Sequence, residues 1–107
     1  MEDLIREAVE TIKKVIEEKD IAVLKILLFG SRARGDFNVD SDWDFFVVIG
    51  DEISREERLD ITVEIKRKLA KLRIPNDIII ASASEVEKRS EDLGDIIYYA
   101  LKEGIEV

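Results

Sequence analysis

Apolar side chains recur along the first part of the chain at the spacing of an α-helix. They are Leu4, Ile5, Ala8, Val9, Ile12, Val15 and Ile16. Because residues three and four apart lie on one face of a helix, this pattern predicts an amphipathic helix over residues 4–18. The run Val23–Phe29 is apolar except at Lys25, and it predicts a strand that is buried on both faces.

The middle of the chain continues with a strand and a long helix. The apolar segment Trp43–Ile49, which ends at Gly50-Asp51, predicts the second strand. Helical spacing predicts a helix over residues 54–73, with Ser54 and Glu57 as its capping box. The buried stripe of this helix is expected to contain Ile61, Ile65, Leu69 and Leu72.

The last third of the chain repeats the alternation of strand and helix. After a break at Pro75-Asn76, the run Asp77–Ala81 predicts a third strand. A short helix with Ser84 and Glu87 as a capping box should follow. A final helix is expected at about residues 92–103, with Gly104 as its C-terminal cap. Its apolar residues are Leu93, Ile96, Ile97, Ala100 and Leu101. Strands separated by helices predict an α/β layer structure, which we assign to one domain, residues 1–107.

Composition narrows the chemistry that is open to the chain. Its 107 residues include no cysteine and no histidine, so acid–base chemistry must use carboxylates, lysine or tyrosine. The net charge of −8 argues against broad binding to nucleic acid through a basic face, but it does not exclude a nucleotide bound through metal ions. No apolar run has the length of a membrane span, and no signal peptide is evident. We therefore expect a cytoplasmic location.

Candidate chemistry concentrates in the loop between the first two predicted strands. Gly30-Ser31 ends the first strand and offers free backbone N–H groups and a hydroxyl to an anion. Asp42 and Asp44 open the second strand and, being two residues apart, should project from the same face. Two carboxylates this close repel each other unless a cation lies between them. Mg²⁺ takes one or two carboxylates and completes its shell with substrate phosphates, so the pattern indicates phosphoryl or nucleotidyl transfer.

A plainer interpretation treats these residues as turn formers. Glycine, serine and aspartate are all common in turns, and Asp77 would then be an ordinary residue after Pro75-Asn76. Against this interpretation, Asp44 lies between Trp43 and Phe45 in an apolar run, where a lone carboxylate is costly.

The sequence Gly30-Ser31-Arg32-Ala33-Arg34-Gly35, followed by Ser41-Asp42-Trp43-Asp44, resembles the signature of the DNA polymerase beta-like nucleotidyltransferases. The resemblance is closest to their minimal branch in bacteria and archaea. It implies a small mixed sheet of three to four strands with helices on one face. It also implies two Mg²⁺ ions, held by Asp42 and Asp44, that bridge the phosphates of a nucleoside triphosphate and the attacking oxygen. Asp77 would be the third carboxylate, either completing the metal site or accepting the proton of the acceptor hydroxyl.

The remaining predicted site residues would bind the nucleotide. Gly30 and Ser31 would hold the β- and γ-phosphates, with Ser31 as the N-cap of one helical turn. Either Arg32 or Arg34 would contact the triphosphate; we favour Arg32, and the other would be solvated or paired with a nearby aspartate. Ser41 is included in this group and should cap or orient the start of the second strand.

The predicted reaction is attack of an acceptor hydroxyl on the α-phosphorus of a nucleoside triphosphate, expected to be ATP, with release of pyrophosphate. The chain leaves no segment for a separate acceptor-binding domain. We therefore expect either that the acceptor is another protein that docks on this one, or that homo- or hetero-oligomerisation completes the acceptor-binding site. The resemblance implies a small helical HEPN-type partner, for which the chain would be the antitoxin, in some cases by attaching AMP.

Two alternatives to this reaction stay open. One is a non-catalytic binding subunit with a vestigial nucleotide pocket. The other is a nucleotidyltransferase for a small hydroxylated molecule. Tyr98 and Tyr99 on the final helix would either belong to a partner surface or, as we favour, pack at the rim of the fold.

Overall fold

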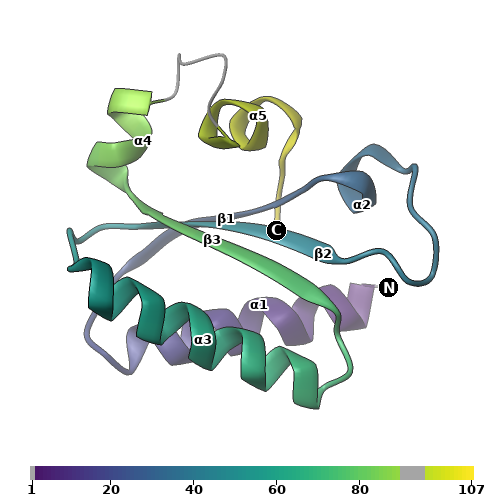
Figure 1. Cartoon of the computed structure of the whole chain (residues 1–107), viewed down its shortest axis with the longest axis horizontal. Coiled ribbons are helices and arrows are strands. Elements are labelled where there is room, and N and C mark those ends of the chain that lie inside the picture. Colours follow the sequence, from purple (N-terminus) through teal and green to yellow (C-terminus); the bar gives the residue numbers. More distant parts are fainter. Residues whose placement is uncertain (1, 90–95) are drawn as a thin grey trace.

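The computed structural model describes residues 2–89 and 96–107 (Figure 1). In chain order its elements are α1 (Glu2–Glu17), β1 (Val23–Phe29), α2 (Ser31–Arg34), β2 (Trp43–Ile49), α3 (Arg55–Lys71), β3 (Asn76–Ser82), α4 (Ala83–Arg89), α5 (Ile96–Glu103) and β4 (Ile105–Glu106). The predicted helices and strands are confirmed in type and order. The start of the final helix, with Leu93, falls outside the described residues. None of the helices in the described ranges is long and apolar enough to cross a membrane.

The strands form one mixed sheet in the order β3-β2-β1-β4. Strand β1 runs antiparallel to both β2 and β4, whereas β2 and β3 run parallel. A parallel pair needs a crossover connection, and the helix α3 supplies it. The predicted α/β (α+β) fold with a mixed sheet is therefore confirmed, and the two-residue strand β4 completes its edge.

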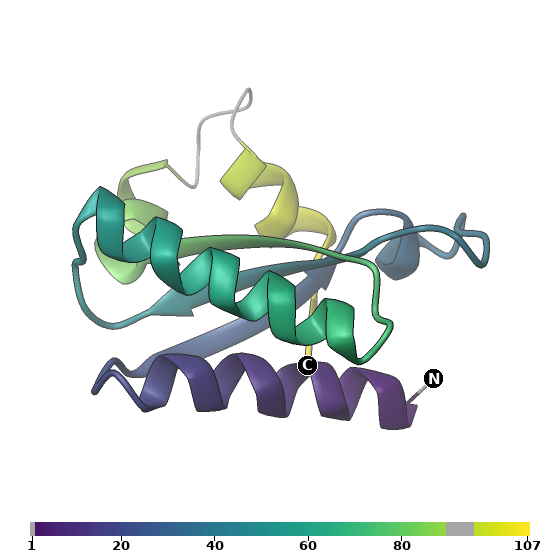
Figure 2. The ribbon, with the colours of Figure 1, turned by 60° about the horizontal axis from the view of Figure 1, so that its bottom comes forward.

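Helices cover both faces of this sheet (Figures 1 and 2). Helices α1 and α3 pack against one face, where Phe45 and Val47 of β2 belong to the larger core cluster. Helix α5 and part of α4 pack against the other face, where Phe46 and Val48 belong to a second cluster. The expectation of helices on one face is therefore wrong. Alternate side chains of a strand point to opposite faces, so two covered faces explain why β2 is apolar at nearly every position.

Helix α3 has the predicted capping box, but only part of its predicted buried stripe. The predicted capping box is confirmed at its start, where the Ser54 hydroxyl accepts a hydrogen bond of 3.0 Å from the Glu57 N–H. Ile61, Ile65 and Leu69 are buried as predicted, but Leu72 is 40% exposed. Helix α3 ends at Lys71, and Leu72 is its C-cap. Because Leu72 lies past the last helical residue, its side chain does not continue the buried stripe of the helix.

The capping box of helix α4 lies two residues before the predicted position. The Ser82 hydroxyl accepts a hydrogen bond of 3.2 Å from the Glu85 N–H, and the Glu85 carboxylate accepts one of 3.2 Å from the Ser82 N–H. The prediction of Ser84 and Glu87 is thus wrong, because β3 passes into α4 without an intervening loop. Gly104 follows α5 as expected, and its N–H donates to the Ala100 carbonyl at 2.8 Å.

Candidate active site

The predicted site residues lie at the end of the sheet where β1 ends and β2 and β3 begin, beside α2 in Figure 1. In the antiparallel pairing, Asp44 is opposite Phe29, which places the Gly30 backbone next to the Asp44 carboxylate. In the parallel pairing, Asp44 is opposite Asp77. The sheet register therefore brings the first strand's end and two of the three predicted carboxylates together.

Gly30 is the position at which the backbone tolerates no side chain. It has φ 74° and ψ −157°, a conformation essentially restricted to glycine. A Cβ atom at this position would lie 2.2 Å from Asp44 Oδ2, far inside van der Waals contact. The Gly30 backbone and the Asp44 carboxylate are thus in close contact, and glycine is required both for the backbone conformation and for the space.

The short helix α2 begins directly after Gly30. The Gly30 carbonyl accepts hydrogen bonds from the N–H groups of Ala33 and Arg34, at 3.1 and 3.0 Å. Ser31 is the first residue of the helix, and Gly30 is the N-cap without a side-chain hydrogen bond. The prediction of Ser31 as the N-cap is therefore wrong, because the glycine conformation starts the helical turn one residue earlier. Ser31 remains half-buried beside the Gly30 backbone.

The charges around Asp44 are unbalanced. Burial is the main reason why the pKa of the Asp44 carboxyl is raised, and the negative charges of Asp77 and Asp42 raise it further. The positive charges of Arg34 and Lys66 only partly oppose this. Asp42 itself is exposed. A divalent cation would offset the repulsion among these carboxylates, so the residues fit an Mg²⁺ site.

The predicted metal ligands do not by themselves provide three side chains close enough to coordinate one ion. Over residues 2–89 and 96–107, no group of three or more histidine, cysteine, aspartate or glutamate side chains is close enough to hold a metal ion. Mg²⁺ commonly takes one or two carboxylates and leaves other positions to phosphates and water. An ion held here would therefore take its other ligands from phosphate and water.

Lys66 of α3 is a site residue that the sequence analysis did not identify. Its ammonium lies 3.2 Å from Asp77 Oδ1, and the same oxygen accepts a hydrogen bond of 3.1 Å from the Ile78 N–H. Helical spacing on α3 places Lys66 next to the buried Ile65. The available sequence signal for Lys66 was its position: it directly follows a core residue on the helix that connects the two parallel strands.

Arg32 holds the loop of residues 30–41, which we call the motif loop. Its guanidinium lies between two aromatic rings, 4.5 Å from the Phe37 centroid and 4.3 Å from the Trp43 centroid. Its Nε and Nη2 atoms donate to the Ser41 carbonyl at 3.3 and 3.0 Å. These contacts engage Arg32 with the motif loop itself. Phe37, the one aromatic residue of the motif loop, was the available signal for this arrangement.

Arg34 is the arginine whose charge acts on Asp44. It is exposed and forms ion pairs with Asp36 and Glu103, both at 3.3 Å. Hydrogen bonds to these two carboxylates, Asp36 first, raise the pKa of Arg34. The pair with Glu103 also links the motif loop to α5.

Ser41 and Trp43 fix the start of β2. The Ser41 hydroxyl accepts a hydrogen bond of 3.0 Å from the Asn38 N–H, and the Ser41 N–H donates to the Asn38 carbonyl at 3.1 Å. The Trp43 N–H donates to the Pro75 carbonyl at 2.8 Å. Because Pro75 directly precedes β3, these bonds set Asp42, Asp44 and the start of β3 in one arrangement.

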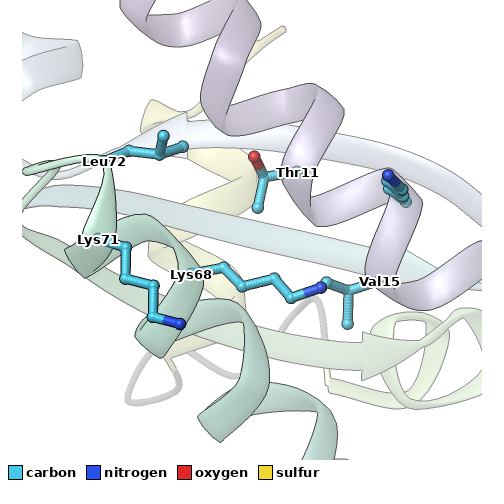
Figure 3. Close-up of a pocket in the computed structure, with 6 residues that line it drawn as sticks. Thr11, Val15, Lys68, Lys71 and Leu72 are labelled. Carbon is cyan, nitrogen blue, oxygen red and sulfur yellow. The ribbon is translucent and has the colours of Figure 1, made fainter.

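Two hollows on the described part of the surface lie near the predicted site residues or between the helices. The hollow drawn in Figure 3, of about 310 Å³, lies between α1 and α3 and contains none of the predicted site residues. It is lined by Thr11, Lys14, Val15, Lys68, Lys71 and Leu72. A second, shallow hollow of about 470 Å³ includes Lys66 and Asn76, the neighbours of Asp77. This second hollow therefore adjoins the residues on either side of the Asp77 contact with Lys66.

Tyr98 and Tyr99 pack edge to face on α5, with their ring centroids 5.3 Å apart. Tyr98 is half-buried, and the Lys102 ammonium lies 5.7 Å from its ring. Tyr99 is 47% exposed, which confirms that at least one of the two is accessible.

Replacing Arg32 with alanine is expected to lower the free energy of unfolding by about 1–2 kcal/mol, because it removes two cation–π contacts and the bonds to Ser41. Urea unfolding followed by the fluorescence of Trp43, the one tryptophan of the chain, measures this change. Arg34→Ala, which loses only exposed ion pairs, is the control and should cost less than about 0.5 kcal/mol. Equal losses in the two variants would show that Arg32 does not hold the motif loop.

Asp44→Asn is expected to stabilise the metal-free protein at neutral pH. Since the pKa of Asp44 in the folded protein is raised above its usual 3.8, the ionised carboxylate destabilises the fold. This penalty is absent below the unfolded-state pKa and grows as the pH rises through the raised value. Urea unfolding in the presence of a chelator should therefore show a more stable variant near neutral pH and no difference in acid. Asp40→Asn, an exposed residue of the same loop, should show no gain.

The fold and the site together define a class of protein. A mixed sheet carries a glycine-serine turn against an aspartate on the next strand, and a further aspartate is in register beside it. The model of the family described as polymerase beta, nucleotidyltransferase matches residues 10–104. The chain belongs to this family. No match was found among curated proteins.

Solved structures share the fold. A crystal structure of a toxin–antitoxin with AMP-PNP is similar with a TM-score of 0.56 and 19% identity, over 91% of this chain and 69% of that one. A mutant of the toxin–antitoxin MntA-HpeT is similar with a TM-score of 0.55 and 19% identity, over 92% and 69% of the two chains. Another mutant, in which two aspartates two positions apart are replaced by glutamate, has a TM-score of 0.56 and 15% identity, over 94% and 69%. At these identities the similarity demonstrates the fold alone.

Proposed function

We propose that this protein is an Mg²⁺-dependent nucleotidyltransferase that transfers the AMP of ATP to a hydroxyl group of a partner protein. The observation that carries the proposal is the contact between the Gly30 backbone and Asp44, with Asp77 in register, in a member of this family. An anion-binding turn beside repelling carboxylates suits a triphosphate that arrives with a divalent cation.

Each site residue has a role in this reaction. Ser31 and the backbone at Gly30 would bind the β- and γ-phosphates, and Asp42 and Asp44 would hold the metal. When bound, Mg²⁺ supplies electrostatic stabilisation of the charge that develops on the phosphate oxygens. Asp77 would complete the carboxylate set on the acceptor side and take the proton of the hydroxyl group.

The bonding changes of the reaction are those of a simple displacement. A bond forms between the acceptor oxygen and the α-phosphorus, and the bond from that phosphorus to the pyrophosphate oxygen breaks. The chain contributes mainly by orientation: the bonds of Arg32 and Ser41 hold the motif loop, and the sheet register holds Asp44 beside Asp77.

The similar solved structures support a partner protein as the acceptor. They are toxin–antitoxin complexes, one of them with AMP-PNP. We therefore propose that this chain acts as the antitoxin of a small helical toxin of the HEPN type, in the cytoplasm. The hollow beside Lys66 and Asn76 is shallow, which suits the side chain of a docked protein.

Transfer of radioactive label tests this proposal. ATP labelled at the α-phosphorus is incubated with Mg²⁺, this protein and a protein that co-purifies with it. We expect label on the partner with wild-type protein and Asp40→Asn, and none with Asp44→Asn or with label at the γ-phosphorus. If Asp44→Asn neutralises the partner as well as wild type does and neither labels it, the chain is a binding subunit and not an enzyme.

A further inference from the structure

The ion pair between Lys66 and Asp77 occupies an oxygen that the proposed reaction needs. Lys66 Nζ lies 3.2 Å from Asp77 Oδ1, and this oxygen also accepts from the Ile78 N–H. Asp77 Oδ1 therefore has two donors in the absence of a metal. A carboxylate held in this way has a lower tendency to turn toward a cation at Asp44.

Lys66 also supplies charge to the rest of the site. It is one of the two cations that act on Asp44, and Asp77 is the carboxylate that acts most strongly on it. Lys66 comes from α3, a packed helix whose Ile65 and Leu69 are fully buried. Its backbone position is therefore fixed, whereas its side chain, 43% exposed, has room to move away.

We propose that Lys66 is an internal counter-ion that competes with the divalent cation for Asp77. This inference rests on the proposed function. Without nucleotide, Lys66 neutralises Asp77 and makes binding of a free metal ion weak. The added ligands of a metal–nucleotide complex overcome this competition, and the Lys66 ammonium then leaves Asp77. The site is thereby completed only when metal and nucleotide arrive together.

Titration with Mn²⁺ alone, followed by the electron paramagnetic resonance signal of the free ion, measures this competition without any turnover. Lys66→Met removes the charge while preserving the length of the side chain. We expect it to bind Mn²⁺ about three- to fivefold more tightly than wild type, the effect of losing one partly exposed ion pair. Lys66→Arg, which keeps the charge, should bind Mn²⁺ as wild type does.

Two further variants separate a specific effect from a change in net charge. Lys68→Met removes the same charge from the same helix, but Lys68 pairs with Glu64, so Mn²⁺ affinity should not change. In an Asp77→Asn background, Lys66→Met should no longer tighten Mn²⁺ binding, because the two residues act as a pair. A gain of the same size in Lys68→Met, or a gain that persists without Asp77, would overturn the inference.

A titration with nucleotide distinguishes failure of this inference from failure of the proposed function. Wild-type protein is titrated with Mn²⁺ in the presence of an ATP analogue with a methylene group between its α- and β-phosphorus atoms, which cannot be transferred. Tight Mn²⁺ binding here, together with unchanged affinity for free Mn²⁺ in Lys66→Met, would overturn the role of Lys66 and leave the nucleotidyltransferase intact. No Mn²⁺ binding with the analogue would overturn both.

Discussion

Gly30→Ala is expected to abolish ATP binding and to reduce transfer by about 100-fold or more, because displacements of about 1 Å in a catalytic site have effects of this size. The new Cβ atom would lie 2.2 Å from Asp44 Oδ2, so either the turn or the carboxylate must move. Alanine also does not adopt the Gly30 conformation without strain, and the free energy of unfolding should fall by about 1–3 kcal/mol. Calorimetric titration with ATP and Mg²⁺ and urea unfolding measure the two effects.

Gly35 provides the matched control for this substitution. It also has a positive φ, 89°, but a Cβ atom there has no neighbour within 4 Å. Gly35→Ala should therefore cost about 1–2 kcal/mol of stability from backbone strain and leave ATP binding unchanged. If Gly30→Ala binds ATP as well as Gly35→Ala does, the Gly30 turn is not part of a nucleotide site.

Asp77→Asn is expected to separate binding from chemistry. In the proposed reaction Asp42 and Asp44 hold the metal of the incoming nucleotide, and Asp77 acts on the acceptor side. Loss of Asp77 should therefore reduce transfer by about 10²- to 10⁴-fold. The Kd for ATP with Mg²⁺ should rise by no more than about tenfold, because Asp77 adds one ligand to a metal that Asp42, Asp44 and the phosphates already hold. Single-turnover transfer and calorimetric titration of the same preparation measure the two quantities.

Asp44→Asn is the comparison for this separation. It should lose both ATP binding and transfer. Asp44 contacts the Gly30 turn, and the negative charges of both Asp42 and Asp77 act on it. Equal loss of ATP binding in the two variants would contradict separate roles for Asp44 and Asp77. Full transfer activity in Asp77→Asn would contradict any role for Asp77 in the reaction.

The sequence was sufficient to predict most of the fold because its local patterns agree with its long-range packing. The apolar run of β1 predicted burial on both faces, and the two core clusters confirm it for residues 26–29. The prediction fails at the start of the strand, where Leu24 is 57% exposed. Helical spacing predicted the buried Ile61, Ile65 and Leu69. The helical spacing failed at Leu72, because the helix ends there. The capping box of α4 was misplaced because the serine-glutamate pattern occurs twice within six residues.

The candidate site was predictable only where its residues are neighbours in the chain. The Gly30-Ser31 turn and the Asp42/Asp44 pair follow from spacing on adjoining strands. The contact of Gly30 with Asp44 depends on sheet register, which no local pattern specifies. Lys66 and Glu103 come from α3 and α5, and their contacts with Asp77 and Arg34 arise from tertiary packing.

Arg32 shows a different limit of sequence reasoning. A basic residue beside the predicted phosphate-binding turn was expected to contact the triphosphate. In the structure it is stacked between Phe37 and Trp43 and donates to Ser41. Composition and spacing indicated a cation at this position but not its partners, because Phe37 lies within the motif loop, Trp43 begins β2, and only the folded chain brings both rings to Arg32.

Calorimetric titration of ATP with Mg²⁺ into wild-type protein and into Asp42→Asn/Asp44→Asn tests the central claim most directly, because it requires no knowledge of the acceptor. Asp40→Asn/Asp51→Asn, which removes the same charge from two exposed positions, is the matched control. We predict Mg²⁺-dependent binding to wild type and to the control variant, and none to Asp42→Asn/Asp44→Asn. Binding that is unchanged in Asp42→Asn/Asp44→Asn, or absent from wild type with and without its partner, would contradict a nucleotidyltransferase site at these residues.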